Sequence, residues 1–264
     1  MKHMMKTLAA LGMAVLCITS CKKELQQPQT EEISQAVKDK IAALGFGTSD
    51  IQIHEDGYLV EGDIVITPGQ LNSTPERRTL RIAGVEQYHA FNLVTGVPRT
   101  ITVSSSGSVN NSVSNAINAA IGRYNAQNLG LTFQRVSSGG DITIKIVNGG
   151  SYIASAGFPD SNGDPYPEVK FNKRFQNYSS GFLTTVMAHE MGHCIGFRHT
   201  DYMNRSFSCG SGGNEGQETT GVGAVHISGT PTGPDAASWM LACLSSTTDR
   251  PFNSNDRKAL DYLY

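Results

Sequence analysis

Residues 189–199 read His189-Glu190-Met191-Gly192-His193-Cys194-Ile195-Gly196-Phe197-Arg198-His199, a stretch with the spacing H-E-x-x-H-x-x-G-x-x-H. Four residues of α-helix advance about 400° and about 6 Å, so His189 and His193 lie one turn apart on one helix face. Two neutral imidazoles placed in this way bind one metal ion at roughly 2.0 to 2.1 Å each. The stretch therefore predicts a helix that carries two ligands of a metal site.

The second half of the stretch predicts a sharp exit from this helix. Gly196 tolerates a positive φ, so the chain can double back and return His199 to the metal as a third ligand. Glu190 follows His189 by about 100° of helix rotation, which aims its carboxylate beside the ion rather than at it. The whole pattern is a zinc hydrolase signature, in which Glu190 acts as the general base for a zinc-bound water.

A later stretch, Ser238-Trp239-Met240, fits a methionine turn beneath the metal. With the motif, it resembles the metzincin clan of zinc peptidases. Thr200-Asp201 after the motif, Ser238–Cys243 and the closing Asp256–Tyr264 extend the similarity over most of the mature chain, which resembles the bacterial lipoprotein peptidases called dual-action HEIGH metallopeptidases. The resemblance implies a zinc metalloendopeptidase that acts on proteins or peptides, with Met240 below the ion. Ala242 stands where two metzincin branches, astacins and serralysins, place a tyrosine metal ligand.

Periodicity predicts an α+β catalytic domain over residues 98–264. The order strand, helix, strand, strand fits a mainly parallel sheet, and a resemblance to matrix metalloproteinases adds an antiparallel edge strand, for a twisted mixed sheet of five strands. A peptide could pair with that edge as a further strand. The expected elements are strand 100–104, backing helix 109–124, strands 131–136 and 142–147, edge strand 153–158, strand 168–172, the metal helix after Ser179 or Ser180, and a C-terminal helix 256–263 capped by Ser254.

The residues before this domain divide into a signal peptide (1–20), a polar tether (21–30), a helix–hairpin segment (31–75) and an exposed linker (76–97). Two lysines followed by the apolar run Leu8–Ile18 are typical of a signal peptide. Ile18-Thr19-Ser20-Cys21 resembles a lipobox, which makes Cys21 the lipidation site; a plain secretory cleavage site is the alternative. Lys22 favours the outer membrane over the inner one, with the periplasmic or outward side left open.

The helix–hairpin segment is predicted to hold a helix at 31–44 and a hairpin hinged at Asp56-Gly57, with a second strand from Tyr58 to Thr67. Within that strand, Val60–Ile64 resembles the propeptide of astacins, in which an aspartate caps the zinc. Asp63 would then be the ligand of a latent form. An ordinary exposed carboxylate is the alternative, and the segment is either a propeptide that is removed or a permanent module.

Several further residues are candidates for the site. Apart from Cys17 in the signal peptide and Cys21, the chain has three cysteines, Cys194, Cys209 and Cys243. In the oxidising compartment expected for an exported protein, we expect a bridge between Cys209 and Cys243, although spacing does not fix connectivity. Asp201 either accepts the proton of a ligand imidazole or caps the following turn. Residues 160–164 place oxygen atoms at alternating positions, so Ca²⁺ is a candidate there, against a plain solvated Asn-Gly turn.

Composition excludes some function classes. The chain has 264 residues, 39% of them hydrophobic, which suffices for one good core and a small appendage. Its net charge of −2 gives no field that would attract nucleic acid, so we expect no nucleic-acid partner, and we expect a monomer held at a membrane by its lipid. The alternative from a different class is a lipid-anchored, zinc-containing binding or adhesion module without hydrolytic activity. A structural zinc needs four protein ligands, and only three histidines stand at motif spacing.

Overall fold

The structure is a computed structural model that describes residues 32–72, 87–211, 224–231 and 233–264. The predicted signal peptide (1–20), Cys21 and the tether (21–30) lie outside the described residues. By their contacts, Ile33–Tyr264 form one unit, which includes the N-terminal segment. Within the described ranges, no helix combines the length and the apolar character that crossing a membrane requires.

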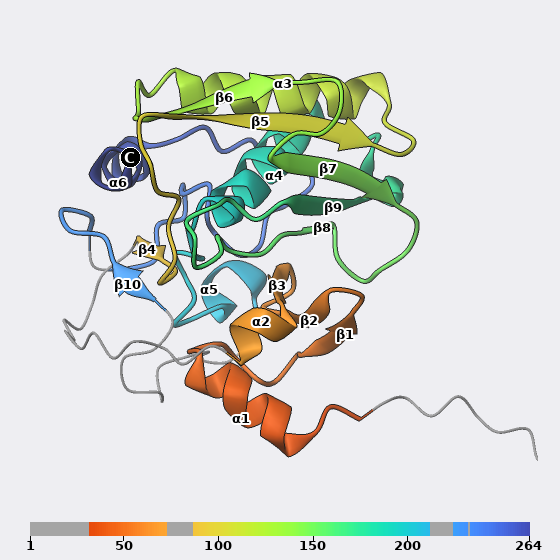
Figure 1. Cartoon of the computed structure of the whole chain (residues 1–264), viewed down its shortest axis with the longest axis vertical. Coiled ribbons are helices and arrows are strands. Elements are labelled where there is room, and N and C mark those ends of the chain that lie inside the picture. The colour runs from red at the N-terminus through yellow and green to blue at the C-terminus, as the bar shows by residue number, and fades with distance from the viewer. Residues whose placement is uncertain (1–31, 73–86, 212–223, 232) are drawn as a thin grey trace, which may run out of the picture. The chain divides into compact units, whose positions relative to one another are not determined.

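A five-stranded sheet organises the chain from residue 99 onward (Figure 1). Its order is β6 (Leu131–Arg135), β5 (Arg99–Ser106), β7 (Ile142–Val147), β9 (Glu168–Asn172) and β8 (Ala154–Ser155). The first four strands run parallel, and β8 pairs antiparallel with β9. The predicted five-stranded, mainly parallel sheet with an antiparallel edge is confirmed. The edge strand is shorter than the predicted 153–158, because only Ala154 and Ser155 pair with β9.

Two long helices pack against each other and against this sheet. The first, α3 (Asn111–Asn125), begins where the Asn110 side chain accepts the amide of Val113. The second, α4 (Ser180–Cys194), is capped in the same way by Ser179. Every residue of α4 from Phe182 to Cys194 is buried, so α4 is a central helix and its two histidines lie inside the protein.

The described part of the predicted linker is not an exposed connector. Residues 87–97 include β4 (Tyr88–His89), which pairs with β10 (Val225–His226), and Gln87, Tyr88, Ala90 and Val94 are buried. We correct the linker prediction for these residues. A two-residue strand leaves no periodicity to detect, and the arginines that precede it dominate the composition.

The C-terminal helix α6 (Ser254–Leu263) begins two residues before the predicted start at Asp256. Its cap is Asn253, which accepts the amides of Asn255 and Asp256, while the Asp256 side chain accepts the amide of Asn253. Ser254 is therefore the first residue of the helix and not its cap. Two short helices, η1 (Lys173–Phe175) and α5 (Ser206–Cys209), complete this part of the chain.

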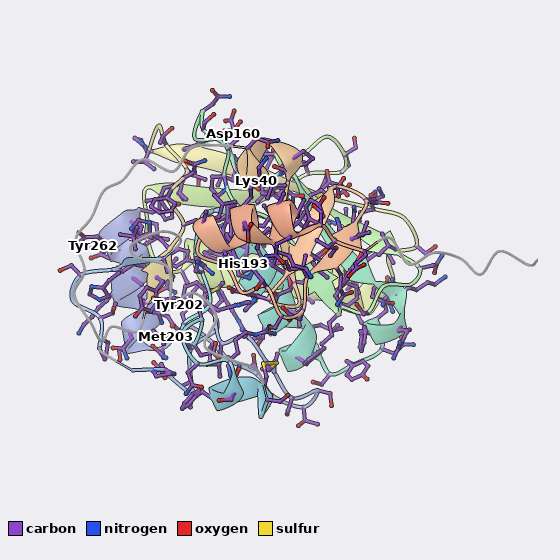
Figure 2. All side chains as sticks on the ribbon, turned by 90° about the horizontal axis from the view of Figure 1, so that it is seen from below. Lys40, Asp160, His193, Tyr202, Met203 and Tyr262 are labelled. Atoms are coloured by element: carbon purple, nitrogen blue, oxygen red, sulfur yellow. A yellow bond between two sulfur atoms is a disulfide. The ribbon has the colours of Figure 1, made fainter. Side chains whose placement is uncertain are left out.

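The N-terminal segment, residues 33–72, consists of a small antiparallel sheet and two short helices. Its elements are α1 (Gln35–Ala43), β1 (Gln52–His54), β2 (Gly57–Val60), β3 (Ile64–Ile66) and α2 (Pro68–Leu71). The predicted long second strand is wrong, because Glu61 and Gly62 have φ of 53° and 90° and turn the chain between β2 and β3. Asp63 follows this turn directly. Figure 2, a view from below, shows the segment in front of His193.

Candidate active site

The metal motif forms the end of α4 and the turn that follows it. His189 and His193 are buried on one face of the helix, with their Nε2 atoms 3.0 Å apart. Gly196 then reverses the chain at φ 110°, where a Cβ would meet Leu93 Cδ2 at 2.7 Å. This return places His199 Nε2 at 3.3 Å from His189 Nε2.

β4 supports the turn that carries His199. The amide of Ala90 donates to the carbonyl of Gly196 at 2.7 Å, and the amide of Arg198 donates to the carbonyl of Tyr88 at 2.9 Å. Residues from the corrected linker therefore fix the path of the chain between His193 and His199. No pattern in the sequence predicted this support.

Backbone carbonyls set the tautomer of the two helical imidazoles. His189 Nδ1 lies 2.8 Å from the carbonyl of Trp239, and His193 Nδ1 lies 2.8 Å from the carbonyl of Phe197. A carbonyl only accepts, so each Nδ1 carries the proton and each Nε2 presents a lone pair to the centre. Burial, followed by the neighbouring imidazoles, lowers the pKa of His193 well below its usual value and favours the neutral ring that binds metal.

The spacing of these nitrogens fits a metal ion. Ligands bound tetrahedrally at 2.0 to 2.1 Å stand about 3.3 to 3.4 Å apart. Lone pairs facing one another in a buried site repel unless a cation lies between them. Zn²⁺ takes imidazole ligands in this arrangement, and His189, His193 and His199 are the residues that would hold it.

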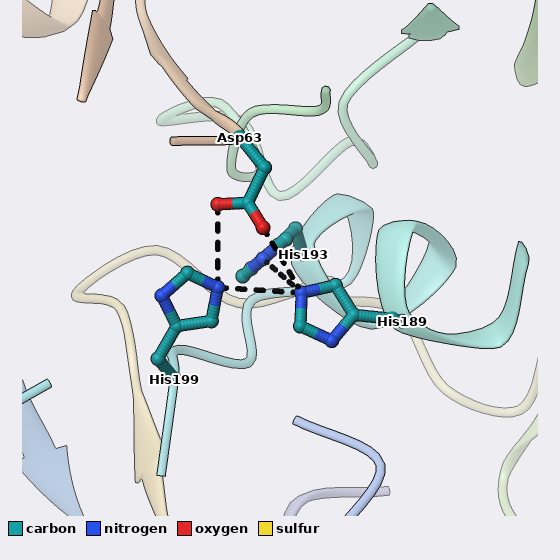
Figure 3. A group of neighbouring side chains, drawn as sticks. All are labelled: Asp63, His189, His193 and His199. Atoms are coloured by element: carbon teal, nitrogen blue, oxygen red, sulfur yellow. Dashed lines mark hydrogen bonds and ion pairs between the residues drawn. The ribbon is translucent and has the colours of Figure 1, made fainter. Parts of the chain in front are cut away.

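Asp63 completes a group of four converging side chains (Figure 3). Its Oδ2 is 3.4 Å from His189 Nε2 and its Oδ1 is 3.3 Å from His199 Nε2. These separations equal those between ligands of one tetrahedral ion, so Asp63 stands at the fourth position. It is mostly buried, with a side-chain exposure of 15%, unlike the ordinary exposed carboxylate that was the alternative.

Glu190 lies beside this group and does not belong to it. Its side chain is buried, and its Oε2 has no hydrogen-bond partner among the described residues. Burial and the negative charge of Asp63 raise the pKa of Glu190 well above its usual value; a cation between the imidazoles would oppose that shift. Glu190 and His189 line a cavity of about 210 Å³. Its carboxylate is therefore placed for a molecule in the cavity.

Met240 lies beneath α4, as a methionine turn requires. A Cβ on Gly192 would be 2.7 Å from Met240 Sδ, so glycine allows the helix to approach the turn this closely. The carbonyl of Met240 accepts the amide of Thr200, and the preceding carbonyl, that of Trp239, binds His189. The methionine turn therefore hydrogen-bonds both to His189 on α4 and to Thr200, the residue after His199.

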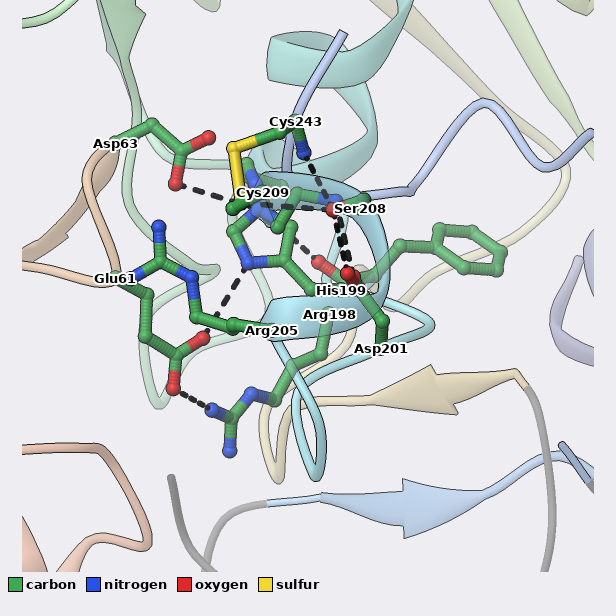
Figure 4. Close-up of polar contacts among 12 residues, drawn as sticks. Glu61, Asp63, Arg198, His199, Asp201, Arg205, Ser208, Cys209 and Cys243 are labelled. Atoms are coloured by element: carbon green, nitrogen blue, oxygen red, sulfur yellow. Dashed lines mark hydrogen bonds and ion pairs between the residues drawn. A yellow bond between two sulfur atoms is a disulfide. The ribbon is translucent and has the colours of Figure 1, made fainter. Parts of the chain in front are cut away.

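The predicted contact between Asp201 and a ligand imidazole is wrong. Asp201 Oδ1 accepts the amide of Ala242 at 3.0 Å, and Oδ2 accepts the hydroxyl of Ser208 at 2.6 Å, so Asp201 ties the chain after His199 to the methionine turn. Ser208 also accepts the amide of Cys243, beside the Cys209–Cys243 disulfide in Figure 4. This bridge pairs the two cysteines expected, and Cys194 is buried and unpaired.

Glu61, rather than Asp201, is the carboxylate next to the Nδ1 atom of a ligand imidazole. Its Oε2 lies 3.4 Å from His199 Nδ1 and its Oε1 accepts a hydrogen bond from Arg198 at 2.7 Å (Figure 4). All three side chains are fully buried. Against the opposing effect of burial, Asp63 and Glu61 raise the pKa of His199 to about 10, so a proton and a metal compete for this ring. The only sequence signal was a pair of acids around Gly62.

The predicted calcium turn is closed by its own hydrogen bonds. Asp160 Oδ1 accepts the amides of Asn162 and Asp164 at 2.9 Å each, and Asp164 pairs with Arg99 at 2.7 Å. Such bonds are typical of an Asx turn. Calcium binding at this turn stays a prediction of the sequence.

The chain is similar to solved structures and to one protein family. Two of the solved structures that resemble the chain carry the titles "Structure of myroilysin" and "Crystal structure of myroilysin"; they are 15% and 14% identical to the chain, with TM-scores of 0.46 and 0.42. Both alignments cover 66% of this chain, and they cover 96% and 86% of those chains. No curated protein matches the chain. The sequence matches the family described as "Dual-action HEIGH metallo-peptidase" over residues 58–264, which begin at β2 and include Asp63 and the whole motif. The chain belongs to this family of metallopeptidases.

Proposed function

We propose that the protein is a metzincin-like zinc endopeptidase in which His189, His193 and His199 hold the ion and Glu190 is the general base. The observation that supports this most is that His189 Nε2 lies 3.0 Å from His193 Nε2 and 3.3 Å from His199 Nε2, with the Glu190 carboxylate beside these rings in a cavity. Zinc bound there would polarise the scissile carbonyl and lower the pKa of its water to about 7.

Glu190 performs the proton transfers of the proposed reaction. Its buried carboxylate accepts a proton from the attacking water and then delivers that proton to the departing amine. The Nδ1 bonds to the Trp239 and Phe197 carbonyls hold the two helical imidazoles in place during both transfers. Met240 and Gly192 fix the helix below them.

We also propose that the full chain is latent. Asp63 stands at the fourth ligand position, where a catalytic site keeps space for water and substrate. The main chain around Asp63 also occupies the sheet edge, because Val65 N donates to Ala156 O at 2.7 Å and Ala156 N donates to Asp63 O at 2.9 Å. A peptide substrate would need this edge and this ligand position, so the segment must move away first. Asp63→Ala favours this movement, because it removes the contacts of the carboxylate with His189 and His199.

The proposed location is the bacterial outer membrane, through a lipid on Cys21. The support is the sequence Ile18-Thr19-Ser20-Cys21 after an apolar run, followed by Lys22. The natural N-terminus and its acylation are read by mass spectrometry of protein from the native membrane. A mature chain that starts at a residue other than Cys21 contradicts the anchor.

The Asp63 contact also favours a second candidate, a zinc-containing binding module. A structural zinc is closed by four protein ligands, and here Asp63 supplies the fourth. In that case the segment never leaves, and replacing Asp63 gives a folded, zinc-loaded protein that cleaves nothing.

One set of variants separates these functions. Full-length Asp63→Ala is compared with the unaltered chain on a quenched peptide library, with zinc content measured on the same samples. We expect activity to rise in Asp63→Ala and to fall by at least about 10² in Asp63→Ala with Glu190→Gln, with zinc retained. Asp261→Asn, on the exposed face of α6, is the matched control. Equal cleavage with and without the Glu190 carboxylate contradicts the assigned mechanism, and equal activity with and without Asp63 contradicts latency.

A further inference from the structure

The cavity beside Glu190 has the character of a side-chain pocket. It measures about 210 Å³ and opens next to Glu190 and His189. Apolar side chains form much of its wall, which suits the stem of a substrate side chain. These are Ile153, Val186, Leu241 and Leu244.

The charged groups of this cavity come from two sources. Its acidic residues are Glu61, Asp63 and Glu190, and its basic side chains other than His189 are Arg205 and Arg250. Glu61 and Asp63 belong to the N-terminal segment. When the segment leaves, Glu190 is the one acid left among these lining residues, and both arginines stay.

Arg250 is held in the wall by neutral groups. Its Nη1 donates to the carbonyl of Cys243 at 3.2 Å, and its amide donates to Thr185 Oγ1 at 2.8 Å. Within the described ranges, no carboxylate lies within 4.0 Å of its guanidinium; the neighbouring Asp249 pairs instead with Arg123 at 2.5 Å. A half-buried guanidinium without a carboxylate is a binding group for an anion.

The N-terminal segment carries acidic side chains that pair with basic side chains of the catalytic part. Residues 44–72 contain five acids and neither lysine nor arginine. Asp50 pairs with Arg205 at 2.9 Å, Glu61 pairs with Arg198 at 2.7 Å, and Lys170 binds both Glu55 and Asp56. The catalytic part of the chain thus binds an acidic segment through its basic side chains.

We propose that the cavity beside Glu190 binds an acidic side chain of the substrate, with Arg250 as the residue that selects it. The peptidase then prefers Asp or Glu at the one position next to the scissile bond whose side chain enters this cavity. This inference rests on the proposed peptidase function and names its substrate class. Arg250 positions no reacting atom; it contributes through the charge of the bound side chain.

The test measures selectivity in the full-length Asp63→Ala protein. Peptides that differ only by Glu against Gln, or Asp against Asn, are compared at each position flanking the scissile bond. We expect one position at which the acid raises kcat/KM at least about tenfold over the amide. Equal rates for acid and amide at every position overturn the inference, and this result needs no change at Arg250.

Variants at Arg250 then assign the preference. Arg250→Gln should reduce the acid-to-amide ratio to within about twofold, whereas Arg250→Lys should keep part of it because the positive charge remains. Arg174→Gln, an exposed arginine outside the cavity, is the matched control and should keep the full ratio. A full ratio in Arg250→Gln overturns the assignment. Cleavage of no peptide by zinc-loaded Asp63→Ala is a different result, because it overturns the peptidase function itself and the inference with it.

Discussion

Glu61 supplies the sharpest test of how this site is held together, because its carboxylate serves two buried partners. It accepts a hydrogen bond from Arg198 at 2.7 Å and faces His199 Nδ1 at 3.4 Å, with all three side chains at 0% exposure. Glu61→Ala leaves the Arg198 charge buried beside the ring of Phe46 and the carbonyl of Gly45. Breaking a buried pair from one side costs about 3 to 5 kcal/mol of unfolding free energy.

The same substitution acts on the metal through His199. Loss of the group that holds a ligand imidazole lowers metal affinity by about 10- to 100-fold, which corresponds to about 1.4 to 2.8 kcal/mol. Glu61→Gln keeps the shape and one acceptor oxygen, so its loss of stability should be smaller, on the order of 1 to 3 kcal/mol.

Two measurements separate these effects. Urea unfolding with a chelator present gives the stability change without metal, and competition against a chromophoric chelator gives the zinc affinity of the folded protein. Asp39→Ala, on the exposed face of α1 in the same segment, is the control. Zinc affinity in folded Glu61→Ala equal to that of the unaltered chain would refute the positioning of His199 by Glu61.

Two further predictions concern the supports around the site. Cys209→Ser with Cys243→Ser should lower the unfolding free energy by roughly 2 to 4 kcal/mol, because the bridge closes a loop across 34 residues; an unchanged urea midpoint contradicts this. Burial raises the pKa of Asp256 to about 6, above about 3.9 in the unfolded chain, so between these values the folded state binds more protons and stability falls as pH rises. Relative to Asp256→Asn, the unaltered chain should lose about 2 kcal/mol of unfolding free energy from pH 4 to pH 6, measured by urea unfolding across that range; parallel pH profiles of the two proteins refute this account.

The parts of the site that sequence predicted are those fixed by local geometry. A helix repeat sets the distance between His189 and His193, and the Gly196 turn brings back His199 only six residues later. The parallel sheet was predictable for the same reason, because alternating strands separated by one helix allow few arrangements.

Only the tertiary structure determined the contacts between residues far apart in the chain. Asp201, two residues after His199, was one candidate for contact with a ligand imidazole, yet it is Glu61, 138 positions upstream of His199, that lies next to the Nδ1 atom of His199. A single glycine could be a strand residue or a turn, and only the docked segment shows the turn that sends Asp63 to the imidazoles. Sequence spacing determines which side chains share a helix face, whereas the fourth ligand position and the charges of the cleft depend on which surfaces pack together in the folded chain.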